Sequence, residues 1–297
     1  MKVFVIIVTY NGKQWYDRCF GSLLKSEMPV QVVAVDNTPG EEDAEYIKSH
    51  YPEVHLITTN ENLGFGKANN LGMRYALDNG CDYVFLLNQD TWIEKDTIAN
   101  LVQVAEKHSD YGILCPLFLK PNKQEIEMMM GVNYDNRPLI NDLYFGHVAD
   151  VYPTNYVGAC AWLLPRKTIE TTGGFDPIFF HYEEDDNYLH RVMYHGLKVG
   201  ICPSARIVHD HHDSPLSDHR LQVRRQQMLI AEWTNINHSF SVSAITRYYL
   251  RKWLSCIFTG KWSGAKQLCA DWKHCMKMRN AIYKSRKENV QKKASWL

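Results

Sequence analysis

The first third of the chain alternates short apolar runs, rich in β-branched residues, with segments of helical pattern. The runs span residues 3–8, 31–35, 54–57 and 83–87, and the helical patterns follow them at 14–25, 41–50, 66–78 and 95–108. Because the runs are apolar on successive residues, we expect strands that are covered on both faces. The alternation predicts an α/β fold with a mostly parallel sheet flanked by helices.

Polar residues collect just past three of these strands. The clusters are Thr9-Tyr10-Asn11, Asp36-Asn37 and Asn88-Gln89-Asp90. Ligands of open parallel sheets bind at the carboxyl ends of the strands, so we expect the three clusters to converge on one crevice. This crevice is the first candidate site.

The later part of the chain is less regular. Residues 120–155 predict a long excursion with a hairpin, and 156–164 predict another buried strand. A helix at 184–195 and strands at 198–202 and 205–208 follow, and the chain is helical in pattern from about residue 216. We therefore expect a catalytic domain over 1–214 and a helical region over 215–297.

Charge divides the chain in the same way. The sequence has 33 Lys and Arg and 33 Asp and Glu; residues 220–297 hold 16 and 3 of them, which leaves 17 and 30 before residue 220. The basic, Trp-rich C-terminal part leaves two interpretations open: contact with an anionic membrane surface, or a helical cap that packs on the catalytic domain and pairs chains into a homo-oligomer. The sequence resembles no known nucleic-acid-binding module.

Two features predict the compartment. The chain has no run of 18 apolar residues, and its first residues lack the basic lead and cleavage site of a signal peptide. Its eight cysteines are scattered, which is typical of reduced thiols. We expect a cytoplasmic protein, with attachment to the inner face of the membrane as the variant in which the basic region contacts lipid.

Acidic residues offer two candidate sites. Residues 183–186 are four consecutive acids at the start of a predicted helix, where they either offset the helix dipole or favour a bound cation or a proton-accepting group. Asp90 either caps the next helix or holds Mg²⁺ or Mn²⁺ together with phosphate oxygens.

Two further segments carry chemistry. Residues 209–213, His-Asp-His-His-Asp, favour a zinc cluster, one histidine in the site, or a solvated loop; neighbours on an extended segment point in opposite directions, so not all five can reach one ion. Residues 62–70 are rich in Gly and Asn but match neither the Rossmann nor the P-loop pattern. They predict a close approach to a nucleotide or a plain capped helix.

Taken in order, these segments resemble glycosyltransferase family 2, whose members have a GT-A type nucleotide-sugar fold, and within it the rhamnosyltransferase-like branch. The resemblance covers about residues 3–214. It is carried by Val8-Thr9-Tyr10-Asn11, Val35-Asp36-Asn37, Asn62-x-Gly64-Phe65, Ala68-Asn69-Asn70-x-Gly72, Leu86-Leu87-Asn88-Gln89-Asp90, Gly158-Ala159, Gly173-Gly174-Phe175-Asp176, Phe179-Phe180, Glu184-Asp185, Arg191, Pro203 and His209.

The resemblance implies a role for each matching residue. The nucleotide sugar would be bound by Thr9, Tyr10, Asn11, Asp36, Asn37, Asn62, Gly64, Ala68, Asn69, Asn88 and Gln89. Asp90 and His209 would be the metal ligands, and the catalytic acids would be Glu184 and Asp185, with Asp185 as the general base. The branch usually reads Glu-Asp-x-Asp where this chain has Glu184-Asp185-Asp186-Asn187, so the base lies among three acids, and the gap-free match on both sides favours Asp185.

The implied activity is an inverting, metal-dependent transfer of a sugar, rhamnose being the one that the branch suggests. The donor would be a dTDP or UDP sugar, and the acceptor a hydroxyl of a growing surface glycan or lipid-linked saccharide. The altered acidic motif leaves one alternative, a non-catalytic nucleotide-sugar-binding or scaffold protein.

Overall fold

The computed structural model describes residues 1–127, 136–210 and 217–297, and its strands form one sheet. The strands are β1 (Val3–Thr9), β2 (Val30–Asp36), β3 (His55–Thr58), β4 (Tyr83–Leu87), β5 (Thr91–Ile93), β6 (Tyr111–Leu119), β7 (Tyr152–Pro153), β8 (Ala161–Pro165) and β9 (Lys198–His209). The helices are α1 (Lys13–Leu23), α2 (Glu42–His50), α3 (Phe65–Asp78), α4 (Thr97–Lys107), α5 (Arg137–Phe145), α6 (Arg166–Thr172), α7 (Glu184–Tyr194), α8 (Asp218–Thr234), α9 (Val242–Phe258) and α10 (Trp262–Asn289).

The strand order is β3-β2-β1-β4-β8-β6-β9-β5, with β7 paired to β9. The half formed by β3, β2, β1 and β4 is parallel throughout. In the other half β8 runs antiparallel to β4 and β6, while β6 and β9 are parallel. The predicted α/β fold with a mostly parallel sheet flanked by helices is confirmed.

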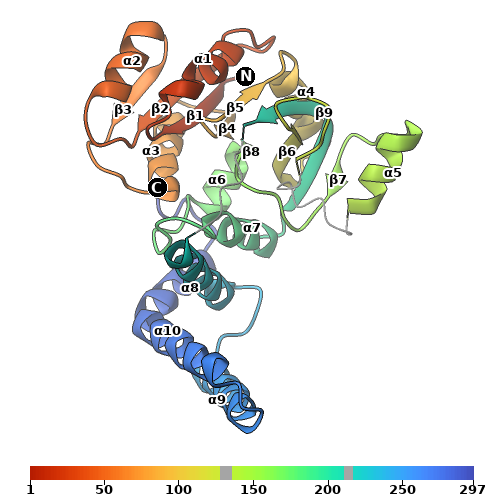
Figure 1. Ribbon diagram of the computed structural model, residues 1–297. Coiled ribbons are helices and arrows are strands. Elements are labelled where there is room, and N and C mark those ends of the chain that lie inside the picture. Colours follow the sequence, from red (N-terminus) through yellow and green to blue (C-terminus); the bar gives the residue numbers. More distant parts are fainter. Residues whose placement is uncertain (128–135, 211–216) are drawn as a thin grey trace.

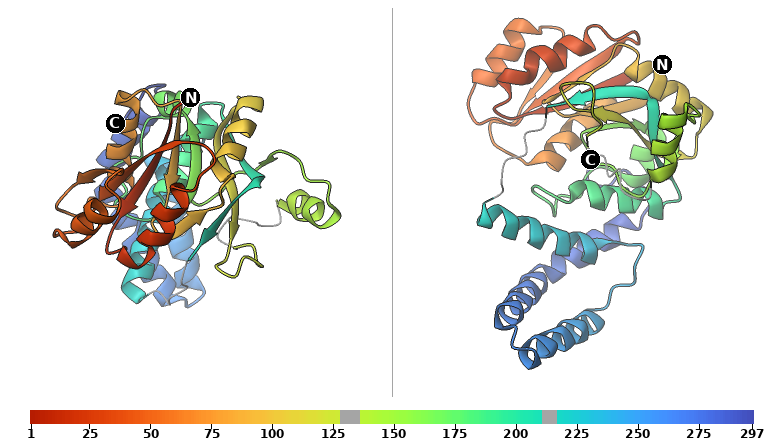
Figure 2. Two further views of the ribbon diagram at one scale, coloured as in Figure 1. Left: turned by 90° about the horizontal axis from the view of Figure 1, so that it is seen from above. Right: turned by 45° about the vertical axis from the view of Figure 1, so that its right-hand side comes forward.

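Helices cover both faces of the parallel half. Helices α1 and α2 lie on one face and α3 lies on the other (Figure 1 and the left view of Figure 2), while α6 and α7 pack on β8, β6 and β9 of the second half. Residues Val3 to Ile7 of β1 are at most 1 % exposed although successive side chains point to opposite faces. The two-sided burial that the apolar runs predict is therefore present.

Three features of the sheet differ from the prediction. Residues 111–119 form the long strand β6, which was not predicted from the sequence. The strand predicted at 156–164 begins only at Ala161, because residues before it turn to place the Cys160 carbonyl 2.8 Å from the Asn88 N–H. The two strands predicted after residue 198 are one continuous strand, β9.

The excursion predicted at 120–155 contains more structure than expected. Its hairpin is present at the end of β6, where the Glu127 N–H donates to the Phe118 carbonyl. The helix α5 was not predicted, and residues 128–135 lie outside the described part of the chain.

The C-terminal part is helical, as predicted. Helices α8, α9 and α10 surround a small core of Trp233, Tyr249, Cys275 and Ile282, and α9 and α10 project away from the sheet (Figures 1 and 2). The C-terminal end of α10 returns to the body that contains the sheet, where Ser285 and Asn289 bond to Asp176. Over the described ranges, every helix is too short or too polar to cross a lipid bilayer.

Candidate functional site

Polar groups that follow β1 and β2 lie together at the carboxyl edge of the sheet. Thr9 pairs with Asp36 in the strand register, and the Thr9 hydroxyl donates to Asp36 Oδ1 at 3.2 Å. The next residues, Tyr10 and Asn11, are exposed at the edge of the sheet. Burial raises the pKa of Asp36, although hydrogen bonds from Thr38 and Thr9 oppose that shift. The predicted convergence of these two clusters is confirmed.

The Asn62 segment joins the same edge. The Asn37 side chain donates to Asn62 Oδ1 at 3.0 Å and accepts from the Leu63 N–H at 2.8 Å. Gly64 has a φ of +79°, and a Cβ there would lie 2.1 Å from the Phe180 carbonyl oxygen. Glycine is therefore required at position 64 both by backbone conformation and by the close approach of the chain that leads to α7.

Gln89 connects the third cluster to the first. Its side-chain amide accepts from the Tyr10 N–H at 2.8 Å and donates to the Tyr10 carbonyl at 3.0 Å. A Cβ at Gly12 would lie 2.0 Å from Gln89 Oε1, so this glycine makes room for the amide. Gln89 thus braces the turn after β1, and neighbouring Asn88 is held through its N–H by the Cys160 carbonyl.

Two predicted nucleotide contacts are placed differently from the rest. Ala68 is fully buried, and Asn69 is 2 % exposed with its amide donating to the Phe65 carbonyl inside α3. The structure does not bring these two side chains to the exposed edge where Tyr10 and Asn11 lie. Their role in nucleotide binding stays a prediction.

The two predicted metal ligands are neighbours. The antiparallel pairing of β5 with β9 places Thr91 opposite His209, so Asp90 lies beside the end of β9. Asp90 Oδ1 is 3.5 Å from His209 Nε2. Two adjacent octahedral ligands, each about 2.1 Å from one ion, are separated by about 3 Å, so this pair fits a shared Mg²⁺ or Mn²⁺.

Glu127 lies beside Asp90 and His209, and these three side chains are called the metal corner below. No sequence signal pointed to Glu127. The hairpin after β6 brings the Glu127 carboxylate 2.6 Å from His209 Nδ1, and both side chains are almost fully buried. The contact of Nδ1 with Glu127 orients the ring so that Nε2 faces Asp90, as second partners of metal-binding histidines do. Burial alone would lower the pKa of His209, but Cys160 and the two carboxylates raise it above its ordinary value.

The zinc alternative finds little support in the described part of the chain. His209 and Asp210 point in opposite directions, as expected for an extended segment: Asp210 Oδ2 accepts from Trp15 Nε1 at 3.2 Å. Residues 211–213 of the predicted cluster lie outside the described residues. Among those described, no three His, Cys, Asp or Glu side chains form a metal cluster.

Asp185 lies across a short segment from the metal corner. The Ala159 N–H is hydrogen-bonded to the Asp185 carboxylate, and the next residue, Cys160, contacts the Thr91 hydroxyl at 3.1 Å and lies close to His209. The segment 159–160 therefore separates Asp185 from Asp90 and His209, and all three belong to one region. Burial raises the pKa of Asp185 above its ordinary value, and these backbone N–H bonds only partly oppose it.

The flanking acids have different surroundings. Glu184 is 6 % exposed, and burial, together with the charge of Asp185, raises its pKa to about 8. Asp186 and Glu183 line a cavity of about 580 Å³ against α8, and burial with repulsion from Asp185 raises the pKa of Asp186. Glu183 and the preceding Tyr182 have positive φ angles of 68° and 71°, so strained backbone leads into α7.

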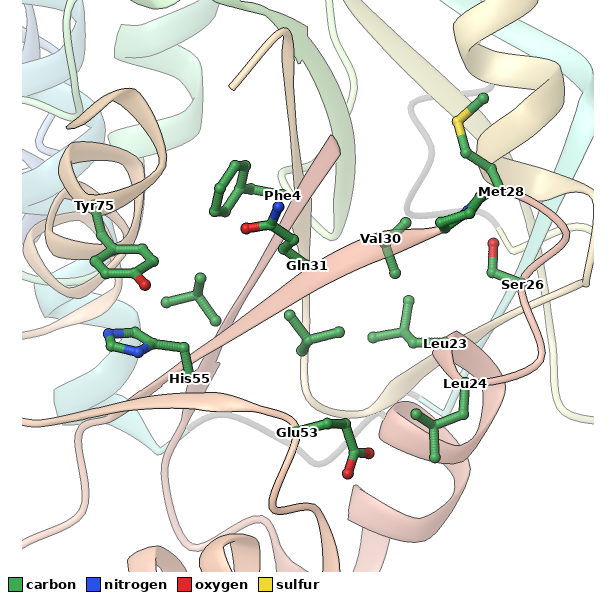
Figure 3. A pocket seen from close by; sticks show the side chains of 13 residues that line it. Phe4, Leu23, Leu24, Ser26, Met28, Val30, Gln31, Glu53, His55 and Tyr75 are labelled. Atoms are coloured by element: carbon green, nitrogen blue, oxygen red, sulfur yellow. The ribbon is translucent and has the colours of Figure 1, made fainter. Parts of the chain in front are cut away.

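A further cavity lies at the opposite edge of the sheet. Its volume is about 470 Å³, and Phe4, Gln31, His55 and Tyr75 line it near the amino ends of β1, β2 and β3 (Figure 3). None of the predicted site residues lines it, so it is separate from the crevice.

The sequence pattern of the first half matches a known family. The model of "Glycosyl transferase family 2" matches residues 4–163, which is more than half of the chain. The chain belongs to glycosyl transferase family 2. Two similar proteins place it in the rhamnosyltransferase-like branch. The dTDP-rhamnosyl transferase RfbF of Shigella flexneri is 24 % identical over 70 % of this chain and 68 % of that protein. The N-acetylglucosaminyl-diphospho-decaprenol L-rhamnosyltransferase of Mycobacterium tuberculosis is 26 % identical over 69 % of this chain and 75 % of that protein.

Solved structures show the same fold as this family 2 chain. Residues 1–349 of Staphylococcus aureus TarS in complex with UDP-GlcNAc align with a TM-score of 0.58 at 12 % identity, over 98 % of this chain and 88 % of that one. GalNAc-T7 with UDP, GalNAc and Mn²⁺ aligns with a TM-score of 0.57 at 15 % identity, over 77 % of this chain. This chain spans about half of GalNAc-T7, 48 %. The GT-A fold expected from the sequence is confirmed.

Proposed function

We propose that the chain is an inverting, metal-dependent glycosyltransferase that moves a sugar from a nucleoside diphosphate to an acceptor hydroxyl. The observation that carries the proposal is the meeting of Asp90 and His209, 3.5 Å apart, beside the crevice, with Asp185 across the 159–160 segment. Family membership supports sugar transfer as the reaction class. The names of the two relatives support dTDP-rhamnose as the first donor to test and a glycan or lipid-linked diphosphate saccharide as the acceptor.

Asp90 and His209 would hold Mg²⁺ or Mn²⁺, and the Mn²⁺ named with GalNAc-T7 supports this assignment. When bound, the ion supplies positive charge that stabilises the negative charge of the departing diphosphate. Glu127 holds the imidazole through Nδ1 and keeps Nε2 directed at the site. It is a positioning residue in this proposal.

Asp185 is the general base in this proposal. It takes the proton of the acceptor hydroxyl as that oxygen attacks from the side opposite the diphosphate, which inverts the configuration at the sugar carbon. A pKa raised by burial makes Asp185 a stronger base than an exposed aspartate. Its neighbours suit the role less, because Glu184 is only 6 % exposed whereas Asp185 is half-buried, and because Asp186 lines the cavity against α8.

Release of nucleoside diphosphate tests the proposal directly. The full chain is incubated with dTDP-rhamnose, and separately with UDP-GlcNAc, in Mn²⁺ and in EDTA. We expect release that requires the metal, at least slowly to water, and faster with a lipid-linked acceptor. Donor binding without release in every arm would contradict turnover and favour the non-catalytic binding protein.

A further inference from the structure

Helices α9 and α10 form an antiparallel hairpin that extends away from the catalytic body (Figure 1 and the right view of Figure 2). The base of this hairpin is anchored: Asp176 Oδ2 accepts from the Ser285 hydroxyl at 2.5 Å and from the Asn289 side chain at 2.9 Å. The opposite end, residues 250–266, is called the hairpin tip below. It lies far from every residue that the proposed reaction uses.

The hairpin tip exposes large apolar side chains. Phe258 is 85 % exposed, Trp262 is 62 % exposed and Leu250 is 53 % exposed. Leu250, Leu254 and Phe258 are four residues apart and therefore share one face of α9. A contiguous exposed group of this kind marks an interaction surface, whereas single exposed apolar residues do not.

An apolar groove continues this face between the two helices. Its volume is about 340 Å³, and it is lined mainly by Leu250, Trp253, Leu268, Cys269 and Trp272. Leu250 belongs to both the groove and the exposed face of α9. The hairpin tip therefore has a protruding apolar surface, and next to it an apolar groove between α9 and α10.

The charge around this surface has one sign. From residue 233 to 287 the sequence has a single acid, Asp271, which is buried and bonded to Arg225 at 2.7 Å. Between residues 242 and 275 every exposed charged side chain is a cation: Arg247, Arg251, Lys252, Lys261, Lys266 and Lys273. Such a surface is complementary to phosphate-rich anionic surfaces and repels a second copy of itself.

We propose that the hairpin tip docks the protein on an anionic lipid bilayer. Phe258 and Trp262 enter the interface between head groups and acyl chains, where aromatic residues are favoured, and the surrounding cations face the lipid phosphates. This inference rests on the hairpin alone, so it stands or falls independently of the transfer reaction.

Vesicle flotation with the full chain tests this surface. The vesicles are phosphatidylcholine alone and phosphatidylcholine with 30 % phosphatidylglycerol, in low and in high salt. The test variant is F258S/W262S. The matched control is Y144S/F145S, which removes a similar pair of exposed side chains, 83 % and 67 % exposed, from α5.

We expect the wild-type chain to float with anionic vesicles only and to be released by salt. F258S/W262S should bind at least about tenfold more weakly, while Y144S/F145S should bind as the wild type does. Absence of wild-type binding, equal binding by F258S/W262S, or equal loss in the control would overturn the proposal. So would light scattering that finds a wild-type dimer, dispersed by F258S/W262S, without binding to lipid.

Discussion

The two sides of the crevice differ in how their polar groups are satisfied. On the side of β1 and β2, side chains such as Thr9, Asn37 and Gln89 bond to one another or to nearby backbone. On the side of α7, carboxyl groups crowd together, burial raises their pKa values, and Glu184 Oε2 has no hydrogen-bond partner among the described residues. The difference fits the proposed division of roles, in which the side of β1 and β2 binds the donor and the side of α7 exchanges protons.

The largest effect on turnover should come from the side of α7. D185N removes the proposed base while keeping its shape, so turnover should fall by roughly 10² to 10⁴, with donor affinity almost unchanged. D186N is the matched control, because Asp186 lines the cavity against α8. Steady-state kinetics and donor titration check both variants; an equal loss in D186N, or full turnover in D185N, would reassign the base.

The next effect should come from the metal corner. E127Q removes the charge that holds His209 Nδ1, and loss of such a partner weakens metal binding by roughly 10- to 100-fold. Titration with Mn²⁺ followed by electron paramagnetic resonance measures this without any turnover. E125Q is the control, because Glu125 is exposed on the same hairpin and pairs with Lys120. Equal Mn²⁺ affinity in the wild type and E127Q would remove Glu127 from the site.

A smaller effect is expected from a packing change on the side of β1 and β2, at Gly12. In G12A the new methyl group displaces the Gln89 amide, and losing its two bonds to Tyr10 should lower the free energy of unfolding by about 1 to 2 kcal/mol and weaken donor binding. G21A is the matched control, since the space around Gly21 in α1 is open, and it should stabilise the helix by about 0.5 to 1 kcal/mol. Urea unfolding compares the two, and equal stabilities would argue against the bracing role of Gln89.

The smallest effect concerns the buried carboxyl of Glu184. Its pKa rises from 4.5 to about 8 in the folded chain, so its contribution to stability is complete below about pH 4.5 and is lost as the pH rises through about 8. E184Q cannot ionise, and between pH 5 and pH 9 it should gain about 1 kcal/mol or more relative to the wild type. E61Q, at an exposed position, is the control; parallel pH profiles of E184Q and wild type would show that Glu184 does not titrate as described.

The sequence predicted the parts of the site that follow from chain order. Polar residues after β1, β2 and β4 meet because parallel strands end at one edge, and the pairing of Thr9 with Asp36 is the direct result. The residues alone left Asp90 as a metal ligand or a helix cap and offered several roles for residues 209–213; only the family resemblance paired Asp90 with His209. Their closeness depends on the antiparallel pairing of β5 with β9, which no local pattern indicates.

Other features depend on contacts between distant residues and could not be predicted. Glu127 reaches His209 across 82 positions through a hairpin whose neighbouring residues have no regular period. Gln89 was predicted to bind the nucleotide sugar, and only the close approach of Gly12 shows that its amide also braces the turn after β1. The strand predicted at 156–164 was too long because its first residues are apolar, yet they form the turn that separates Asp185 from the metal corner.

Helix α10 is continuous over 28 residues, a length of about 42 Å. Its first turn belongs to the hairpin tip, and its last turn holds Asp176, eight positions before Glu184 in the sequence. The orientation of the first turn of α10 is therefore coupled to the position of Asp176 and of the α7 acids that follow it. If the hairpin tip docks on a bilayer as proposed, this one helix joins the docked end to the crevice and holds the crevice at a fixed angle to the lipid surface.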